Sequence, residues 1–485
     1  MKSTAKLYAY QAVATAINLL FPFFSFPYIT RVLQPQALGT VNYIDFITQF
    51  FIGLALFGTP LYVVRNTALY TKDKDALQTF ASQIFSLRLL MITISVIGFL
   101  LLCVLSPQAN NSFSLVALGA INIAVSGMQS DSFLQGLQQF KFIAWRTAII
   151  KLATLLLLFA FVTSPADTSF YYLILVSAVA VTTITDLFFL KLQGLRIRLT
   201  SKIKTQLKAS TVFVSINLCI ATYYSLGVYL LGLTAGLLAV GFFTTALKLQ
   251  GYFQTLIRDA GLVGLPQVTQ LQTQASDKQP HHLLHQTATL LFFLVLPVSC
   301  LLYLFSDELI QIFAGTQYSP SAPLLRILAF LPVFTGISNV LGIQGLLGLN
   351  HEQLLLKSVA WASALFLIST PTIFIWPGAH TLAWLLLSVE AVVCLLTYYH
   401  LSKVAPFQIN VYFVLQQIFL GITLCLLTTT VLKWSNMQGL WKIGTGAVLF
   451  LALYIITHRF VLKNPALQLI SKALHQVILT KKRWL

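Results

Sequence analysis

Long apolar runs separated by short polar segments repeat along the whole chain. Fourteen runs are long enough to cross a bilayer as helices, because a transmembrane helix needs about 20 mostly apolar residues. They cover approximately residues 7–29, 40–64, 84–105, 112–135, 143–163, 169–190, 209–232, 237–258, 287–306, 324–349, 355–376, 379–401, 412–432 and 440–462. Lipid offers the backbone no hydrogen-bond partners, which favours helices, and the runs lack the alternation of barrel strands. The pattern predicts an all-α integral membrane protein with about fourteen transmembrane helices.

Basic residues are unevenly distributed over the segments between these runs. If the N-terminus is cytoplasmic, 25 of the 30 Lys and Arg residues fall on cytoplasmic segments, four fall on external ends, and Lys248 lies inside a run. Cytoplasmic segments of membrane proteins carry such an excess. The distribution therefore predicts that both termini are cytoplasmic. A span missed anywhere would reverse the assignment of every later segment.

Composition favours a membrane protein over a soluble one. Hydrophobic residues make up 57% and charged residues 9% of the 485 residues, whereas soluble domains carry about 25% charged residues. The net charge of +18 accompanies no nucleic-acid-binding motif, so we expect anionic lipid headgroups, and no nucleic acid, as its counterpart. The cysteines lie inside apolar runs without ligand spacing, so we expect no disulfide, metal or other cofactor.

Motifs of catalytic chemistry are missing from the sequence. It contains no glycine-rich phosphate loop, no GxSxG and no HExxH. The longest external segment, residues 306–323, offers only Asp307 and Glu308 as polar catalytic candidates. We therefore expect a protein that moves a substrate and is not an enzyme. A membrane glycan polymerase or glycosyltransferase is a less favoured alternative.

A short internal repeat divides the chain. The triplet Ala37-Leu38-Gly39 recurs in similar form as Ala239-Val240-Gly241, 202 residues later, and each copy follows a turn after a long apolar run. Repeats of this kind are common in transporters. We interpret residues 1–208 as an N-terminal six-helix lobe with a basic cytoplasmic loop and residues 209–403 as a second six-helix lobe. Residues 404–462 would add two helices, and residues 463–485 a basic amphipathic cytoplasmic tail.

Ionisable residues inside the apolar runs are candidate functional groups, because each costs about 2.5–3.5 kcal/mol at the centre of a membrane helix. Lys248 and Glu390 are the deepest, and Asp45 lies in the outer part of the second run. Asp131 and Asp186 lie near inner ends, where a local ion pair is an alternative role. Prolines within the runs predict helix kinks: Pro22, Pro27, Pro60, Pro297, Pro332 and Pro371.

Four segments carry a resemblance to a known family. They are residues 18–22 and 26–33 (NLLFP and FPYITRVL) with Gly39, residues 57–62 (FGTPLY) with Arg65, residues 135–144 (QGLQQFKFIA) with Arg146, and Ala246, Lys248, Leu265 and Pro266. In this order they resemble bacterial polysaccharide repeat-unit flippases, the O-antigen and exopolysaccharide transporters of the multidrug/oligosaccharidyl-lipid/polysaccharide exporter superfamily. Similar proteins commonly carry Trp where Phe133 stands and Glu where Gln138 stands. The resemblance is spread over about residues 1–275.

The resemblance implies a fold and a location. The two six-helix lobes would form a V around a central cavity that opens to one side of the bacterial cytoplasmic membrane at a time. The implied cargo is an undecaprenyl-pyrophosphate-linked oligosaccharide, moved from the inner to the outer leaflet for polysaccharide biosynthesis. Membrane lipids, a polysaccharide polymerase and glycosyltransferases are the implied partners.

The implied cargo directs attention to cations, since an anionic pyrophosphate is stabilised by charge-assisted hydrogen bonds, above all from Arg. The candidate substrate-binding residues are Arg31, Arg65, Arg146, Lys248 and Arg258, and the candidate ion-coupling residues are Asp45 and Glu390. The main alternative is a cation-coupled multidrug exporter of the same superfamily, which the basic excess at spans one, two and eight disfavours. The glycan stays open between exopolysaccharide, capsule, O-antigen and teichoic-type units.

Overall fold

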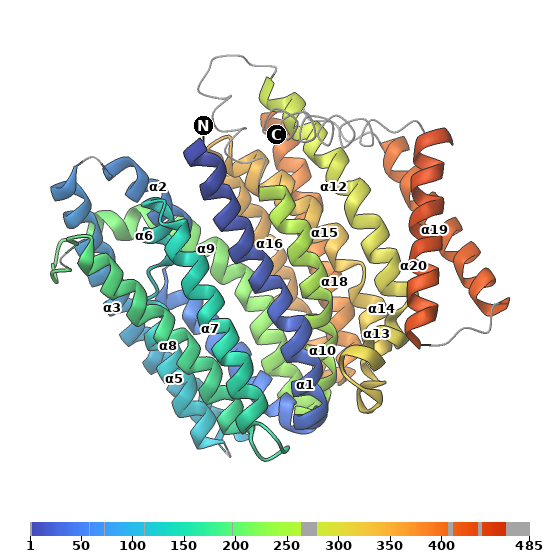
Figure 1. Cartoon of the computed structure of the whole chain (residues 1–485), viewed down its shortest axis with the longest axis horizontal. Coiled ribbons are helices and arrows are strands. Elements are labelled where there is room, and N and C mark those ends of the chain that lie inside the picture. Colours follow the sequence, from blue (N-terminus) through green and yellow to red (C-terminus); the bar gives the residue numbers. More distant parts are fainter. Residues whose placement is uncertain are drawn as a thin grey trace. The chain divides into compact units, whose positions relative to one another are not determined.

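The computed structural model describes residues 2–461 except positions 58, 72, 111, 196, 263–278, 406–410 and 435–438 (Figure 1). This described part is helical and contains no β-strand. Twelve of its helical stretches are long and apolar enough to cross a membrane. The prediction of an all-α, multi-pass membrane protein is therefore confirmed. The predicted amphipathic tail, residues 463–485, lies outside the described residues.

Two of the twelve stretches are interrupted by one non-helical residue each. Helix α1 (Lys2–Ala55) is broken at Gln34, which has φ 62° and ψ 168°. The stretch Lys204–Thr255 joins α9 (Lys204–Ala221), the π-helix η1 (Thr222–Leu226) and α10 (Gly227–Leu262), and α10 is broken at Gly236 with φ 82° and ψ 171°. When the two arms of each stretch are counted separately, the described residues contain fourteen candidate spans, which is the predicted number.

The other helices of the first half are α2 (Thr59–Tyr70), α3 (Lys74–Leu105), α4 (Pro107–Asn110), α5 (Phe113–Gly127), α6 (Asp131–Gly136), α7 (Phe140–Phe161) and α8 (Thr168–Leu192). Those of the second half are α12 (Gln279–Leu304), α13 (Ser306–Phe313), η2 (Thr316–Tyr318), α14 (Ser321–Leu328), α15 (Leu331–Asn339), η3 (Val340–Leu347), α16 (Glu352–Ser369), α17 (Pro371–Ile375), α18 (Ala379–Val404), α19 (Val411–Trp434), α20 (Gly439–Ile456) and η4 (Thr457–Val461).

Half of the prolines expected to kink helices stand at helix starts instead. Pro22 and Pro27 lie inside α1 and Pro297 inside α12. Pro60, Pro332 and Pro371 occupy the first two positions of α2, α15 and α17, where the missing N–H has no intrahelical partner to lose. The prediction of one continuous span over residues 40–64 was also wrong. Helix α1 ends at Ala55, and a new helix, α2, begins at Thr59.

The helices of the first half alternate in direction, as a membrane protein with short connections requires. Contacting pairs show that α8 runs parallel to α5 and antiparallel to α7, and that α5 runs antiparallel to α3. The pairs are Ser114 with Ser169, Val125 with Thr183, Phe142 with Phe189, Phe99 with Gly119, and Ile92 with Gly127. These directions are those predicted for spans three to six.

The two arms of α1 run in opposite directions. In the first arm Phe21 lies against Lys151 and Tyr28 donates a hydrogen bond to the carbonyl of Val162, so this arm is parallel to α7. In the second arm Tyr43 hydrogen-bonds Ser106, and Phe51 packs against Phe99, so this arm is antiparallel to α3. Because α3 and α7 are parallel, the break at Gln34 turns the chain back. The arms are therefore two separate spans.

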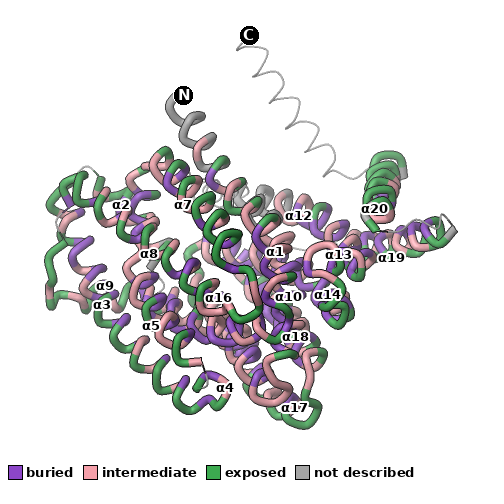
Figure 2. The backbone as a smooth tube through the Cα atoms, turned by 60° about the horizontal axis from the view of Figure 1, so that its bottom comes forward, coloured by how far each residue is buried: buried purple, intermediate pink, exposed green. Residues whose placement is uncertain are grey.

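The chain forms two compact units. The first contains the residues up to Thr245 together with Phe313–Tyr318 and Val359–Leu386, and the second contains Ala246–Ile312, Ser319–Ser358 and the described residues from Leu387 onward. Within the first unit, the outward sides of α3, α5 and α8 carry many exposed positions (Figure 2), and apolar residues such as Leu105 and Ile184 are among them. Such surfaces suit contact with lipid. The predicted lobe boundaries at residues 208 and 403 stay a prediction.

The breaks at Gln34 and Gly236 are 202 residues apart, which is the offset of the repeat seen in the sequence. The residue before a proline is driven out of the helical region, which accounts for a break before Pro35. Gly236 reaches its positive φ without the steric cost of a Cβ. Gln34 adopts the same region with a side chain, in a conformation that costs about 1–3 kcal/mol outside glycine.

Just after each break, the two repeats touch backbone to backbone. A Cβ on Gly39 would lie 1.9 Å from the carbonyl oxygen of Leu237, and one on Gly241 would lie 2.0 Å from that of Pro35. Gly39 and Gly241 occupy the same position of the two repeats, and so do Pro35 and Leu237. Each glycine therefore meets the carbonyl of the other repeat, as a local twofold axis requires. Only glycine permits this approach. The two short sequence triplets therefore mark a contact between the repeats.

A hydrogen bond continues this contact one turn further along. The Asn42 side-chain amide donates to the Thr244 hydroxyl at 2.7 Å, both residues are buried, and they are again 202 positions apart. We call the contacts of residues 35, 39 and 42 with residues 237, 241 and 244 the repeat crossing. It lies at the end of the spans that the charge distribution assigns to the outside.

Candidate functional site

Arg31 lies at the C-terminal end of the first arm of α1, three residues before the break, and is exposed. Its own carbonyl and that of Thr30 accept hydrogen bonds from the side chain of Gln317, at 3.4 and 2.9 Å. The guanidinium reaches back to the carbonyl of Pro27 at 3.4 Å. The segment Phe313–Tyr318 thus fixes the backbone at Arg31 while leaving the side chain accessible.

Arg65 is exposed on the short helix α2, which follows the C-terminal end of the second arm of α1. That arm, residues 35–55, separates Arg65 from Arg31. At 1.5 Å per residue it is about 30 Å long, which is the thickness of the hydrocarbon core of a bilayer. The structure therefore does not bring Arg31 and Arg65 together, and the two residues cannot hold one pyrophosphate at the same time.

Arg146 is buried and joins two carboxylates. Its Nη2 lies 2.7 Å from Asp131 Oδ1, and its Nη1 forms an ion pair with Asp186 Oδ1. The side chains of Arg146 and Asp186 are 6% and 0% exposed, whereas that of Asp131 is 38% exposed. Arg146 Nε and Asp186 Oδ2 have no hydrogen-bond partner among the described residues. This triad ties the start of α6, the first half of α7 and the last turns of α8 together.

Asp45 is half-buried on the second arm of α1 and faces polar groups of its own arm and of α8. Its Oδ1 accepts from the Gln49 amide at 3.3 Å and from the Tyr172 hydroxyl at 3.5 Å. Tyr172 is buried, so the half-buried carboxylate of Asp45 contacts a hydroxyl that is shielded from solvent. The predicted role of Asp45 in ion coupling stays a prediction.

Lys248, Arg258 and Glu390 all belong to the second unit. Lys248 is half-buried in α10, and Glu390 is 4% exposed in α18. Both make further interactions. Arg258 lies on the last turns of α10, and its side chain is outside the described residues. The roles of these three residues stay predictions.

Two cations that the sequence analysis did not single out are held inside the first unit. Arg88 is fully buried on α3 and donates to the carbonyl of Gln129 at 2.6 Å, which compensates a carbonyl just beyond the end of α5. Lys151 on α7 lies 4.4 Å from the ring centre of Phe21, a favourable cation–π contact. Arg88 lies inside the apolar run 84–105. Its place in that run was the feature of the sequence that indicated a buried partner.

Three carboxylates on segments that the charge distribution assigns to the outside make structural contacts. Asp307 pairs with Arg326, and Glu308 pairs with Lys442. Asp167, between α7 and α8, accepts hydrogen bonds from the backbone N–H groups of Thr163 and Ser164. These donors stabilise the ionised form and hold the pKa of Asp167 below its usual value. The acidic groups that an external catalytic site would need therefore already have a structural role.

These features define a class of protein: a polytopic helical membrane protein with a short internal repeat and charged groups placed inside its spans. Residues 5–272 match the family described as polysaccharide biosynthesis protein. The match covers more than half of the 485 residues, and the chain belongs to this family. The resemblance seen in the four sequence segments is confirmed.

Two relatives carry the same name. The chain is 26% identical over 364 residues to the "Putative O-antigen transporter" of Escherichia coli (strain K12), which covers 74% of this chain and 87% of the relative. It is 23% identical over 385 residues to the protein of that name from Shigella dysenteriae, which covers 78% of this chain and 95% of the relative. The alignments thus extend well beyond the first half.

Solved structures share the fold at low identity. The lipid II flippase MurJ, in an inward closed conformation, superposes with a TM-score of 0.65 at 12% identity and covers 94% of this chain and 100% of that chain. An inward-facing multidrug resistance transporter of the MATE family reaches 0.60 at 12% identity and covers 80% of this chain and 94% of that chain. Both comparisons support the helical transporter fold.

Proposed function

We propose that this protein is a flippase that carries a lipid-linked oligosaccharide across the bacterial cytoplasmic membrane for polysaccharide biosynthesis. The observation that carries the proposal is membership of the polysaccharide biosynthesis protein family together with relatives named as O-antigen transporters. The cargo is an undecaprenyl-pyrophosphate-linked repeat unit, moved from the cytoplasmic to the outer leaflet. A polysaccharide polymerase and glycosyltransferases are the proposed partners in the pathway.

The repeat crossing supports an alternating-access mechanism. Two halves that meet through a local twofold contact at one end can separate there and close at the other end, and such rocking of repeats is typical of transporters. Both termini and the basic loop between α8 and α9 would face the cytoplasm, as the charge distribution predicts. In this mechanism the crossing closes the outer side until cargo leaves.

The first test locates the cargo after depletion of the protein. Cells that make the glycan are depleted, and the lipid-linked repeat unit is then probed on each leaflet of the cytoplasmic membrane. We expect the unit to accumulate on the cytoplasmic leaflet, because a large polar glycan cannot cross hydrocarbon unaided. Delivery to the outer leaflet at the normal rate would reject the function.

The second test concerns the proposed cationic contacts with the pyrophosphate. Arg31→Ala and Lys248→Ala should each lower export about 10-fold or more at unchanged protein level, because a hydrogen bond to a charged group contributes about 1.5–3 kcal/mol. Lys141→Ala, an exposed cation at the start of α7, is the matched control and should leave export unchanged. Normal export in both variants would remove the cationic contacts from the proposal.

Arg65, Arg146 and Arg258 complete the proposed set of substrate contacts, and Asp45 and Glu390 are the proposed ion-coupling groups. Arg31 and Arg65 lie at opposite ends of one span, so we propose that they meet the cargo at different stages of transport. A multidrug exporter is the second candidate, because MATE structures share the fold. A drug-resistance profile of the depleted strain separates the two, since only the exporter predicts sensitivity to unrelated drugs.

A further inference from the structure

Residues 197–203, which precede α9, lie along α3 without regular secondary structure. The backbone N–H of Arg198 donates to the hydroxyl of Ser82 at 3.2 Å, and that of Thr200 donates to the hydroxyl of Ser86 at 2.9 Å. Two donors of a segment without regular structure are thereby satisfied by side chains of a neighbouring helix. We call residues 197–203 the strap.

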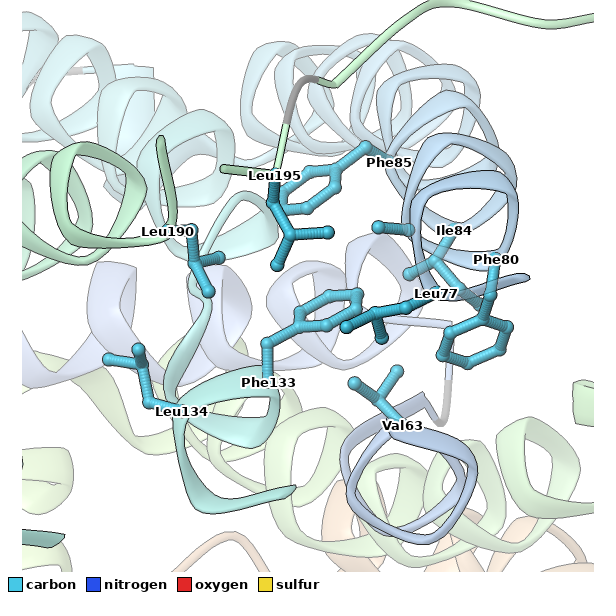
Figure 3. Packing of buried hydrophobic residues seen from close by; sticks show 10 residues of the cluster. Val63, Leu77, Phe80, Ile84, Phe85, Phe133, Leu134, Leu190 and Leu195 are labelled. Carbon is cyan, nitrogen blue, oxygen red and sulfur yellow. The ribbon is translucent and has the colours of Figure 1, made fainter. Parts of the chain in front are cut away.

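Apolar anchors fix the chain at both ends of the strap. Leu195 is 7% exposed and packs in a cluster with Phe85 and Phe133, among residues of α2, α3, α6 and α8 (Figure 3). At the other end, Ile203 packs against a second cluster that contains Leu87 and Val214. The strap is therefore a fixed surface, and its outward side chains have defined positions.

The strap and its flanks are strongly basic. The exposed cations are Lys191, Arg198, Lys202, Lys204 and Lys208. The sequence contains no Asp or Glu between Asp186 and Asp259, so neighbours along the chain offer no countercharge. Several neighbouring cations lower the free energy of an anion that lies along the strap.

The strap also exposes apolar side chains among its cations. Ile197 is 39% exposed and Leu199 is 72% exposed. The strap joins two membrane spans, of which α8 ends at Leu192 and α9 begins at Lys204. It therefore lies at the edge of the hydrocarbon layer, where apolar side chains can enter the acyl region while Lys and Arg reach phosphate groups.

We propose that the strap binds the headgroups of anionic phospholipids in the leaflet that it faces, which is the cytoplasmic leaflet in the predicted orientation. Arg198 and Lys202 hold the phosphates, and Ile197 and Leu199 enter the acyl layer beside α3. The serine hydroxyls of Ser82 and Ser86 hold the backbone so that both sets of side chains point outward together. Lipid binding at this site is independent of the cargo and of transport.

The experiment uses the full-length protein in a neutral detergent, titrated with dioleoyl phosphatidylglycerol or with dioleoyl phosphatidylcholine. Bound lipid is counted by native mass spectrometry, and thermal unfolding is followed in parallel. A basic residue near an anionic surface contributes about 1 kcal/mol, or about fivefold in affinity. The Arg198→Gln/Lys202→Gln variant should therefore bind phosphatidylglycerol roughly 25-fold more weakly, while the weak binding of phosphatidylcholine stays unchanged.

The matched control is Lys74→Gln/Lys141→Gln, which removes two exposed cations at the starts of α3 and α7. It should bind phosphatidylglycerol as the unchanged protein does. Equal losses in the two variants would show a general effect of net charge and would overturn the site. Ser82→Ala/Ser86→Ala, which keeps every cation, should also weaken binding because the strap loses both backbone contacts.

A further arm separates bulk phospholipid from a lipid pyrophosphate, which has the same headgroup chemistry. Undecaprenyl pyrophosphate is added at saturation to the protein loaded with phosphatidylglycerol. Retention of the phosphatidylglycerol supports the proposal. Complete displacement of the phosphatidylglycerol would overturn the proposed ligand. If undecaprenyl pyrophosphate then binds the Arg198→Gln/Lys202→Gln variant more weakly than the unchanged protein, the strap is a binding site for the cargo.

Discussion

A covalent link between residues 42 and 244 is expected to abolish transport. Asn42 and Thr244 meet through a 2.7 Å hydrogen bond at the repeat crossing, next to the glycine contacts that bring the two backbones together. If cargo leaves between the two predicted lobes, residues 42 and 244, which lie on either side of the predicted boundary at residue 208, must separate in every cycle. A short thiol crosslinker bound to Asn42→Cys and Thr244→Cys should therefore hold the outer side closed. Export is measured before and after crosslinking, and reversal with a cleavable reagent should restore it.

The matched control joins two residues that should stay together throughout the cycle. Ser114 and Ser169 lie on α5 and α8 of the same half, with hydroxyls 2.8 Å apart, so crosslinked Ser114→Cys/Ser169→Cys should remain active. Both pairs are built in a variant that lacks the five native cysteines and is first shown to export normally. If the fully crosslinked 42–244 protein still exports at the normal rate, the halves do not separate at the repeat crossing.

The fourteen spans could be predicted because lipid imposes a simple rule on sequence. Each span needs a long apolar run, and charge alternates between the ends, so errors in the count would have shown in the distribution of Lys and Arg. The rule does not distinguish one long helix from two short ones. Phe57 has a positive φ of 47° and Pro60 begins a new helix, so the second span ends earlier than hydropathy indicated.

The repeat was visible in the sequence only as two triplets. Its physical basis is that Gly39 and Gly241 must lack a side chain where the backbones meet, while the residues around them are free to differ. Gln34 and Gly236 share a conformation but not an identity. The backbone geometry is therefore repeated more faithfully than the sequence, which explains why the sequence signal was short.

The site was less predictable because charges find partners from distant segments. Arg146 resembled a free cation in the sequence, yet it pairs with Asp186, 40 residues later. One signal was present: in an antiparallel hairpin, partners lie equally far from the turn, and both residues are 20 positions from Ala166. Arg31 and Arg65 border the second span at its two ends, as the charge distribution predicts, and their contacts with the substrate stay a prediction.

The triad of Arg146, Asp131 and Asp186 yields the largest expected effect on stability. Arg146→Met removes the one cation between two carboxylates, of which Asp186 is fully buried. Breaking a buried pair in this way costs about 3–5 kcal/mol, because a charge is left without compensation. We expect a large drop in the unfolding temperature in detergent and a lower protein level in cells. Arg65→Met, at an exposed position on α2, should change stability by less than about 0.5 kcal/mol.

Variants of the two carboxylates test whether uncompensated charge causes the loss of stability. Asp186→Asn should destabilise less than Arg146→Met, because it leaves one cation and one carboxylate, and Asp131→Asn should have the smallest effect because Asp131 is partly exposed. The triple variant Arg146→Met/Asp131→Asn/Asp186→Leu should recover most of the lost stability, since apolar groups can replace a buried ion pair at little cost. A triple variant as unstable as Arg146→Met alone would show that the damage comes from lost packing on α7 and not from uncompensated charge.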